Sequence, residues 1–475
     1  VRACVRACVR ACVRRRTVRA CVRVCVRACL LSCVPACVLL AFVQTLPAAP
    51  GSTTPDWPRT EQHALALLQQ YIRIASVNPP ADTRATADLL RREFEQAGFS
   101  PKIYQSTPEG KTNLLVRLPG RDSSLKPLLL LNHMDVVPVD AKQWPIDPFG
   151  AIVKDGQLWG RGALDMKCVG VMQLTAIILM KQLGIVPPRD IVFLATADEE
   201  TNGEGGAAWM MTHHWPELDP AYVLDEGGFG STDVFTPNKL IFGISVGDKQ
   251  VVWLQLQARG TSGHASQPIA DNANDTLLHA IEKARAIPSA SSTNAIVEQM
   301  RQSVAGKFAS NKFINAIQQN TISLTTLRSG VGDPPKANVI PSIAEATLDC
   351  RLLPGQNADE FVSGIKARIN DPRVAVTRLN KTVDAAPSNT NTPLFESMKR
   401  SIGQTFPGAV VTPILVPYGT DGQKFRSRGI PVYGLTPMVV DAATVATMHS
   451  DKEHININQF NRGLHFYFDL LAAGF

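Results

Sequence analysis

Three segments of strand type end in acidic or histidine side chains, and these side chains are common protein ligands of divalent metal ions. In open α/β sheets, ligands bind in the crevice outside the carboxyl ends of the strands. A chain that gathers carboxylates and imidazoles at those ends can hold a metal ion and use it to activate water. The three segments are "NHMDVVP", "TADEET" and "VLDEGG".

The first segment places His133 two residues before Asp135. Residues two apart on a strand share a face, so the carboxylate of Asp135 can lie behind the imidazole of His133. A carboxylate in that place fixes the tautomer of a metal-binding histidine and raises its basicity. A plainer alternative for this pair alone is a histidine at a strand end beside a solvated aspartate.

The second segment sets Glu199 directly beside Glu200 after an apolar strand. Neighbouring strand residues point to opposite faces, but at a strand end the chain turns, so both side chains can converge on one cluster. One glutamate would then bind a metal, and the other would hold a proton taken from metal-activated water. Two close acids raise each other's proton affinity, whereas a metal favours the ionised form, so the two roles separate.

Two further segments and the third strand end complete the candidate cluster. Asp165 stands between the turn Gly160–Gly162 and a long apolar helix, where a plain N-terminal cap is the alternative. The turn resembles a phosphate-binding loop only superficially, because neither G-x-G-x-x-G nor a Walker lysine follows. The other candidates are Asp225 and Glu226 in "VLDEGG" and His449 in "MHSDKEHI".

Other catalytic templates are missing from the sequence. It contains no H-E-x-x-H and no C-x-x-C, which disfavours single-zinc helix proteases and zinc ribbons. The remaining histidines are expected at the surface or in packing contacts; they are His63, His213, His214, His279, His454 and His465.

The elements that must position these residues predict an α/β fold with a mainly parallel sheet flanked by helices. Continuous apolar strands separated by helices are typical of such a sheet, since both of its faces are covered. Two helices are predicted over residues 60–98, strands over 112–120, 127–138, 189–200 and 221–228, and helices over 167–184 and 204–214.

Around Gly247 the pattern changes to the alternation of a half-exposed antiparallel strand. Residues 247–381 then read β-α-β-β-α-β, which predicts an inserted α+β domain of ferredoxin-like order. The Ser- and Ala-rich stretch 288–320 is expected to enlarge this domain. Residues 55–246 and 382–475 would form the main, catalytic domain. The predicted elements are strand 249–260, helix 271–287, strands 320–330 and 342–355, helix 358–369 and strand 374–379.

The composition, 45% hydrophobic and 19% charged, is that of a soluble globular enzyme. The formal charge of +7 is misleading, because nine of the 48 basic residues and none of the 41 acidic ones lie in residues 1–50. The remaining 39 basic and 41 acidic residues nearly balance, which gives no reason to expect a nucleic-acid partner. Eight of the ten cysteines lie between Cys4 and Cys37. The other two, Cys168 and Cys350, are expected to be small buried hydrophobic residues.

Residues 1–50 are a repeat tract followed by a signal-like segment. The opening "VRACVRACVRACV" has a period of four that no helix or strand explains, and it is typical of translated simple-sequence DNA or a misassigned start. The apolar run "LLSCVPACVLLAFVQTLPAAPGS" resembles a secretory signal peptide more than a membrane span, because it is short and contains Pro35. We therefore expect a secreted or periplasmic protein without a stable membrane span in its mature form, or a cytoplasmic one if the start is misassigned.

The motif order "HMDVVP … GRGALDMK … ADEE … LDEGG … GHAS … NVIP … HSDKEHI" closely resembles the two-metal aminoacylase and carboxypeptidase family of metallopeptidases. That family includes glutamate carboxypeptidase, succinyl-diaminopimelate desuccinylase, aminoacylase and carboxypeptidase S. The resemblance spans residues 55–475, and "LDEGG" together with the lengthened inserted domain looks most like carboxypeptidase S.

The resemblance implies a pair of zinc ions as the cofactor, and Co²⁺ or Mn²⁺ can also suit these ligands. Each ion would have its own histidine and glutamate, and one aspartate would bridge the two. Carried over to this sequence, the ligands would be His133 and Glu226 for one ion, Glu200 and His449 for the other, and Asp165 as the bridge.

The resemblance also implies roles for the neighbours of these ligands. Asp135 would orient His133, and Glu199 would be the general base. Glu226 is preferred over Asp225 as the ligand, although one step of alignment separates them. A cis peptide bond often follows the bridging aspartate of the family, here Asp165.

Further residues resemble groups that recognise substrate in the family. His264 in "GTSGHASQP" resembles a histidine donated to the tetrahedral oxyanion, often across a dimer. Asn338 and Arg351 could hold a substrate carboxylate, Arg351 by its bidentate fork. The alternative for Arg351 is a salt bridge on the surface of the inserted domain. Gly419 and Thr420 match a loop that lines the family's site.

The function implied is zinc-dependent hydrolysis of amide bonds in N-acyl amino acids or short peptides that carry a free carboxylate. The inserted domain would serve as a lid and could form a homodimer. A carbamoyl or ester hydrolase on the same metal site is the first alternative. A catalytically inactive homologue that acts as a binding protein is the second.

Overall fold

The structure is a computed structural model, and it describes residues 54–107, 109–286, 294–305 and 307–475. The predicted repeat tract and the signal-like segment lie outside these residues. Among the described residues, no helix is both long and apolar enough to span a membrane.

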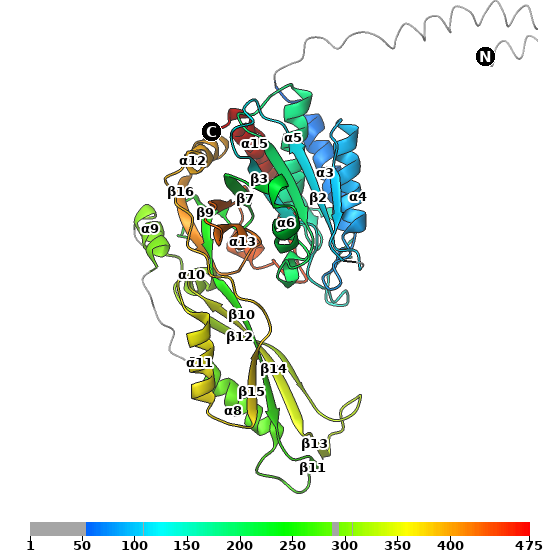
Figure 1. The fold of residues 1–475 in the computed structure, drawn as a ribbon, viewed down its shortest axis with the longest axis vertical. Helices are drawn as coiled ribbons and strands as arrows, with labels where there is room; N and C mark the ends of the chain where they lie inside the picture. Colours follow the sequence, from blue (N-terminus) through cyan, green and yellow to red (C-terminus); the bar gives the residue numbers. More distant parts are fainter. Residues whose placement is uncertain (1–53, 108, 287–293, 306) are drawn as a thin grey trace, which may run out of the picture. The chain divides into compact units, whose positions relative to one another are not determined.

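A nine-stranded sheet, called here the large sheet, carries the segments that the sequence marks as chemically active (Figure 1). Its centre is parallel, because β3 pairs in parallel with β6 and β7, and β7 with β17. The strand order is β1-β2-β6-β3-β7-β17-β9-β16, and β8 pairs with β9. The strands are β1 (Lys102–Gln105), β2 (Thr112–Leu118), β3 (Leu128–His133), β6 (Ile191–Thr196), β7 (Tyr222–Asp225), β8 (Phe229–Ser231), β9 (Ile241–Asp248), β16 (Val410–Val416) and β17 (Val432–Gly434).

Helices cover both faces of the large sheet (Figure 1). In β3, Leu128 and Leu130 join one hydrophobic core, and Leu129 and Leu131 join another on the opposite face. This double burial explains why the strand reads as a continuous apolar run. The helices are α3 (Trp57–Arg73), α4 (Arg84–Gln96), α5 (Lys167–Gln182), α6 (Ala207–His213), α7 (Trp215–Leu218), α12 (Pro393–Thr405), α13 (Gly422–Arg426), α14 (Ala442–Val445) and α15 (Ile457–Ala473).

A second, four-stranded antiparallel sheet, called here the small sheet, has the order β12-β14-β10-β15. Its strand β10 alternates between buried and half-buried residues, as the sequence pattern predicts. Both sheets belong to one folded unit, Pro55–Phe475. The elements are β10 (Gln250–Arg259), β11 (Gly263–His264), α8 (Ala273–Arg285), β12 (Thr321–Ser329), β13 (Val339–Ile340), β14 (Ile343–Leu352), α11 (Ala358–Ile369) and β15 (Val374–Arg378).

The order β10-α8-β12-β14-α11-β15 is that of a ferredoxin-like unit, and α8 and α11 share a hydrophobic core with these strands. The predicted fold class is therefore confirmed: an α/β fold with a mainly parallel sheet flanked by helices and an inserted α+β ferredoxin-like domain. The boundaries at residues 247 and 381 stay predictions.

One expectation for the inserted segment differs from the structure. The helices α9 (Ala295–Ser303) and α10 (Lys312–Ile317) do not enlarge the core of the small sheet. They pack into the core of the large sheet through Ile296, Met300 and Ile317. α9 packs against β16, the edge strand of the large sheet.

A three-stranded sheet that the sequence pattern does not predict joins distant parts of the chain. β18 (His454–Asn456) pairs with β5 (Gln157–Trp159), which pairs with β4 (Ile152–Lys154). This pairing holds the segment after His449 beside the segment before Asp165. The two candidate ligands are thereby brought near each other.

Candidate metal centre

Asp165 lies between the two candidate histidines. Its Oδ1 is 3.2 Å from Nε2 of His133, and its Oδ2 is 3.1 Å from Nε2 of His449. One carboxylate thus presents a different oxygen atom to each imidazole. This arrangement suits a ligand that is shared by two metal ions.

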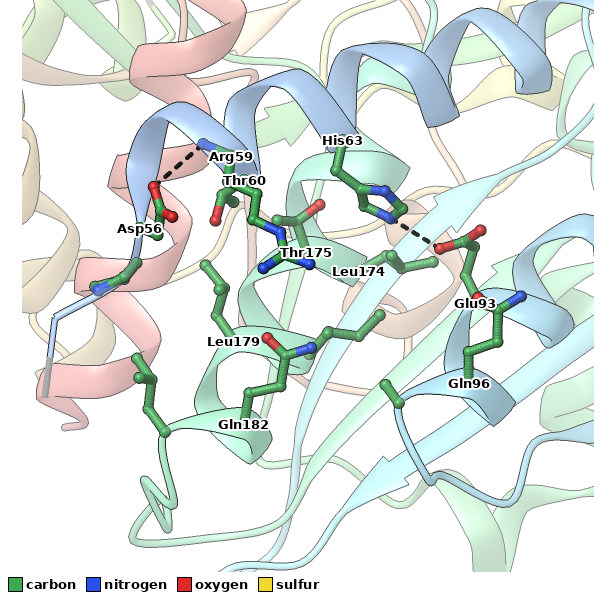
Figure 2. Close-up of a pocket in the computed structure, with 14 residues that line it drawn as sticks. Asp56, Arg59, Thr60, His63, Glu93, Gln96, Leu174, Thr175, Leu179 and Gln182 are labelled. Carbon is green, nitrogen blue, oxygen red and sulfur yellow. Dashed lines mark hydrogen bonds and ion pairs between the residues drawn. The ribbon is translucent and has the colours of Figure 1, made fainter. Parts of the chain in front are cut away.

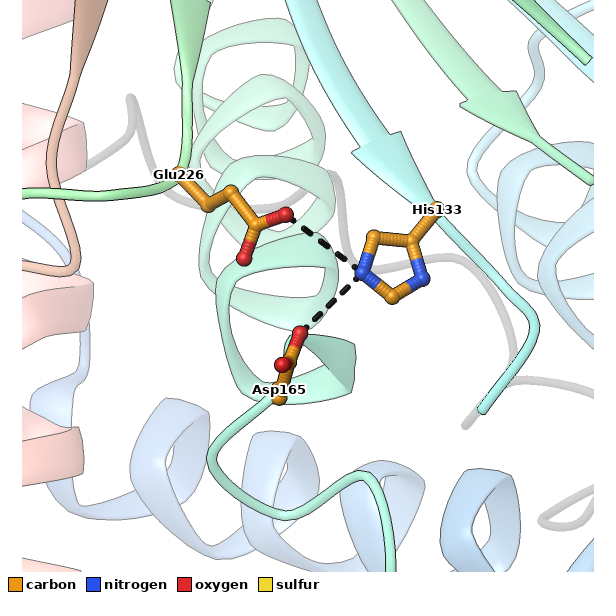
Figure 3. Close-up of side chains that lie close together, drawn as sticks. All are labelled: His133, Asp165 and Glu226. Atoms are coloured by element: carbon orange, nitrogen blue, oxygen red, sulfur yellow. Dashed lines mark hydrogen bonds and ion pairs between the residues drawn. The ribbon is translucent and has the colours of Figure 1, made fainter. Parts of the chain in front are cut away.

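The two candidate glutamates complete two groups of metal-type ligands around Asp165. Glu226 Oε1 is 3.5 Å from His133 Nε2 (Figure 3), and Glu200 Oε2 is 3.4 Å from His449 Nε2. Within each group the ligand atoms all lie within 4.8 Å of one another. The structure therefore brings all five predicted ligands together, in two groups that share Asp165.

The loop that carries Asp165 is held by a buried glutamate from the C-terminal segment. Glu453 is fully buried, and its Oε1 accepts hydrogen bonds from the backbone N–H groups of Gly162, Leu164 and Asp165 at 2.8–3.1 Å. Its Oε2 pairs with the guanidinium of Arg161. Asp165 is not the cap of α5, since Met166 occupies that position without a side-chain cap. The predicted cis peptide bond between Asp165 and Met166 is confirmed.

The paired glutamates lie on a short turn after β6. The 3₁₀ helix η1 spans Glu199–Thr201, and Asp198 before it has a left-handed backbone with φ of 73°. The strand alternation therefore ends before the pair, as the sequence argument expects. Both Glu199 and Glu200 line one cavity, so adjacent side chains serve one site.

Asp135 follows β3 and contacts this turn, but its contact with His133 differs from the expectation. Nδ1 of His133 is 2.9 Å from the backbone carbonyl of Asp135, whereas the carboxylate Oδ1 is 3.6 Å away. The Asp135 carboxylate instead accepts the backbone N–H groups of Glu199 and Glu200, each at 3.2 Å, and the amide of Asn78 at 2.7 Å. Asp135 thus orients the imidazole through its backbone and the glutamate turn through its side chain.

Of the two acids at the end of β7, only Glu226 belongs to a ligand group. The carboxylate of Asp225 turns away and accepts the backbone N–H of Gly422 at 2.8 Å. Burial raises the pKa of Asp225 to about 6, and the nearby acids Asp421 and Asp248 add to the rise. Asp225 is therefore placed to fix the loop before α13.

Burial dominates the electrostatics of the cluster. It raises the pKa of Glu226 to about 8, and the charge of Asp165 adds to the rise. The pKa values of Glu200 and Glu199 are raised by burial too, and neighbouring acids add to the effect. Several carboxylates thus compete for few protons in a site that is shielded from water. Such a group is stable in its charged form only beside cations.

The histidines show the same imbalance. Burial lowers the pKa of His449, but its contacts with Asp165 and Glu200 outweigh burial and raise the pKa to about 11. The pKa of His133 is also raised well above its usual value, since its acidic neighbours outweigh its burial. The imidazoles are thus acting as the cations of the cluster. Divalent metal ions bound by imidazole nitrogen and carboxylate oxygen fit this donor set, because they would neutralise the acids and release the protons.

The cavity beside the ligands has a volume of about 420 Å³ and is lined by the small sheet and by loops that follow strands of the large sheet. From the small sheet it receives Trp253 and Arg351, and from the loop before α13 it receives Gly419 and Thr420. Three of the four predicted substrate-binding residues therefore lie at the cavity. Asn338 is exposed and does not line it.

His264 also lies outside the cavity of its own chain. It is an exposed residue of β11, which pairs with β13, and the backbone N–H of Ala265 bonds to the carbonyl of Asn338 at 3.0 Å. His264 and Asn338 thus lie together at the pair of β11 and β13, which Figure 1 shows beyond the small sheet. Within one chain, the structure does not bring them to the ligand groups.

A separate cavity of about 560 Å³ lies between α3, α4 and α5 (Figure 2). Apolar residues of α5, among them Leu174 and Leu179, form one wall, and the ion pair of His63 with Glu93 lies at the other. None of the predicted site residues lines it. The larger volume therefore does not mark the chemically active region.

The remaining histidines and the two cysteines behave largely as expected. His465 stacks on Trp57, and His454 stacks on Trp159. Cys168 and Cys350 are buried free thiols, and burial raises the pKa of Cys350 to about 12. Neither cysteine is a reactive thiolate near neutral pH.

The contact of Glu453 with the loop that carries Asp165 is not predicted from the sequence. The only signal of Glu453 in the sequence is its place four residues after His449 in "HSDKEHI". That spacing alone does not separate a buried acid from a solvated one.

Replacing Glu453 by Gln should lower metal affinity about 10- to 100-fold, the usual effect of losing a group that supports a metal ligand. The reason is that the N–H groups around Asp165 would lose their charged acceptor. A calorimetric titration with zinc measures the change in metal affinity. Glu298→Gln, on the exposed face of α9, is the control. A lower melting temperature at unchanged zinc affinity would show that Glu453 only supports the fold.

Residues 129–473 match the sequence profile of "Peptidase family M20/M25/M40". The chain belongs to this family. Membership in the M20/M25/M40 family makes the chain a metal-dependent hydrolase of amide bonds, and the five clustered ligands agree with that class.

Individual relatives span most of the chain. Aminoacylase-1 of Mus musculus is 29% identical over 433 residues, which are 89% of this chain and 97% of the relative. The probable carboxypeptidase S-like 2 of Dictyostelium discoideum is 27% identical over 390 residues, which are 76% of this chain and 74% of the relative. The M20 family metallo-carboxypeptidase Sso-CP2 of Sulfolobus solfataricus has the same fold, with a TM-score of 0.68 at 17% identity over 86% of this chain and 98% of that one.

Proposed function

We propose that this M20/M25/M40 family member uses two metal ions to hydrolyse N-acyl amino acids or short peptides with a free carboxylate. Zinc is the metal that we propose first. One observation carries the proposal: Asp165 gives one oxygen to the group of His133 and the other to the group of His449. Two ions that share a carboxylate can act on one substrate carbonyl together. The aminoacylase and carboxypeptidase names of the relatives support the substrate class.

The residues that would hold the ions are the two groups around Asp165. His133 and Glu226 would hold one ion, and Glu200 and His449 the other. The donor set suits zinc, and it also suits Co²⁺ or Mn²⁺. When bound, the ions would polarise the scissile carbonyl and lower the pKa of a water molecule.

Glu199 is the proposed general base. It lines the cavity next to Glu200 but belongs to neither ligand group, so its carboxylate is available to accept a proton from water. Burial raises its pKa well above the usual range, and a nearby cation would bring that pKa down again. A carboxyl group tuned in this way can take the proton and then deliver it to the leaving nitrogen.

Two other functions remain as alternatives to be tested against this one. A carbamoyl or ester hydrolase would use the same ligands, since the metal chemistry does not depend on the leaving group. An inactive binding protein is less well supported, because every predicted ligand and Glu199 are present and gathered in one place.

A substrate panel tests the proposed function. The full chain should be stripped with a chelator, reloaded with zinc, and assayed on N-acyl amino acids, dipeptides, carbamoyl amino acids and esters. We expect turnover of N-acyl amino acids or dipeptides that disappears with the metal and returns with zinc. Turnover that a chelator leaves unchanged would overturn the proposal, and turnover of carbamoyl substrates alone would favour the first alternative.

We further infer that His264 serves the site of a second copy of the chain. The support is its position: it is exposed and lies off the cavity of its own chain, beside Asn338. A homodimer formed through the inserted domain could place the two residues of one copy against the ligand groups of the other.

Mixing two inactive variants tests this inference. Glu199→Gln and His264→Ala should each be inactive alone, and mixed dimers should regain turnover because one of their two sites has both Glu199 and His264 intact. The measurement is the rate after the two chains are unfolded and refolded together, with sedimentation to count chains. A monomer in solution, or no recovery from a verified mixed dimer, would count against the shared site.

A further inference from the structure

The wall of the cavity formed by the small sheet carries an ion pair between Arg351 and Asp349. Nε of Arg351 is 2.6 Å from Oδ1 of Asp349, and Nη2 is 2.8 Å from Oδ2. The two residues are two apart on β14, so their side chains share a face. Both line the cavity, as do Val251 and Trp253, the residues opposite them on β10.

This pair occupies only one edge of the guanidinium. Arginine can bind a carboxylate through Nε and Nη2 or through Nη1 and Nη2. Asp349 takes the first edge, and among the described residues Nη1 of Arg351 donates to no protein acceptor. The side chain of Arg351 is 23% exposed and lines the cavity, so a ligand in the cavity can reach it.

In the described part of the chain, the carboxylate of Asp349 accepts side-chain hydrogen bonds only from Arg351. A free arginine side chain is long and populates many rotamers, and it loses that freedom when it binds a ligand. An arginine already held in a plane by a bidentate partner loses less of it. The ion pair therefore orients Arg351 for a planar ligand and still leaves it able to bind one.

We propose that Asp349 is a positioning residue that fixes the guanidinium plane of Arg351, so that its Nη1–Nη2 edge receives the substrate carboxylate. The inference rests on the proposed function and narrows it: the substrate presents a single planar carboxylate to the small sheet. Since the pair as a whole is neutral, recognition depends on the geometry of the two hydrogen bonds more than on net charge. An amidated or esterified substrate would gain nothing from the pair.

The test is the kinetics of Asp349→Asn on an N-acyl amino acid and on its amide. We expect KM for the free acid to rise about tenfold while kcat stays near that of the unmodified enzyme, the mark of lost ground-state and transition-state binding alike. KM for the amide should not change. Asp349→Glu, which restores the charge, should recover part of the affinity.

The chain offers a matched control. Asp371 and Arg373 form the same pair two residues apart, with contacts of 3.0 Å and 2.6 Å, and neither lines the cavity. Asp371→Asn should leave both KM values unchanged. Arg351→Ala should raise KM for the free acid further, and Arg351→Ala with Asp349→Asn should equal Arg351→Ala alone, because the two residues act as one unit.

Three results would overturn the inference. A lower KM in Asp349→Asn would mean that Asp349 competes with the substrate. An equal rise in KM for acid and amide, or additive losses in the double variant, would mean that Asp349 acts elsewhere. If the unmodified enzyme hydrolysed no substrate, the proposed function would be wrong. The role of Asp349 could still be tested by measuring the binding of the product amino acid by calorimetry.

Discussion

Replacing Glu199 by Gln should lower kcat roughly 10²- to 10⁴-fold, the contribution usually made by a general acid–base group, while the metal content stays unchanged. The amide has the size of the carboxylate but cannot take a proton from water. It also leaves both ligand groups intact, because Glu199 belongs to neither. Steady-state kinetics and elemental analysis of the same preparation make the measurement.

The neighbours of Glu199 provide the controls for this experiment. Glu204→Gln changes an exposed glutamate of the same loop and should keep normal turnover. Glu200→Gln should lose metal as well as activity, since Glu200 lies 3.4 Å from His449. A Glu199→Gln enzyme with a normal kcat would show that another group accepts the proton.

Replacing Asp165 by Asn should abolish turnover and reduce the binding of both ions. A neutral amide has a single acceptor oxygen, so it cannot serve His133 on one side and His449 on the other as the carboxylate does. The loss of one charge also weakens the attraction for both cations. The measurement is equilibrium dialysis against zinc with elemental analysis of the bound metal.

His449→Ala tests whether His449 binds one ion only, in contrast to Asp165, which is proposed to bind both. His449 contacts only Asp165 and Glu200 among the ligands, so this variant should keep one ion and lose the other. His213→Ala, on the exposed end of α6, should keep both. Equal losses of metal in Asp165→Asn and His449→Ala would contradict the bridging role of Asp165.

The features of the fold that could be predicted from the sequence are those set by the pattern of neighbouring residues. The apolar run of β3 and the alternation of β10 follow from burial on two faces and on one face, so each strand is visible in its own residues. The strand ends at His133 and before Glu199 follow in turn, because polar residues interrupt the apolar runs there. The parallel order of the sheet then places these ends together.

The parts that could not be predicted depend on contacts between distant segments. Glu453 meets the N–H groups around Asp165 across 288 residues of chain, and no short-range pattern encodes that meeting. Likewise, α9 has an amphipathic face that either core could bury, and only the three-dimensional packing selects the core of the large sheet. The exposed position of His264 has the same origin, since the pairing of β11 with β13 carries it away from the cavity.

The contact between Asp135 and His133 shows which details of an interaction cannot be predicted from sequence spacing. Spacing on a strand correctly makes the two residues neighbours, but it does not tell a backbone acceptor from a carboxylate. In the structure, the imidazole of His133 contacts the backbone carbonyl of Asp135 at 2.9 Å. The carboxylate of Asp135 accepts hydrogen bonds from the turn that carries Glu199 and Glu200. The turn after β6 needs that acceptor because its first N–H groups have no partner inside so short a helix.

The central claim is that two cations share Asp165, and anomalous X-ray diffraction at the zinc edge tests it most directly. Crystals of the zinc-loaded enzyme should show two anomalous peaks in the cavity, roughly 3.5–4 Å apart, one near His133 and Glu226 and the other near His449 and Glu200. The oxygens of Asp165 should reach both peaks. A single peak, or two peaks of which Asp165 touches only one, would contradict the account.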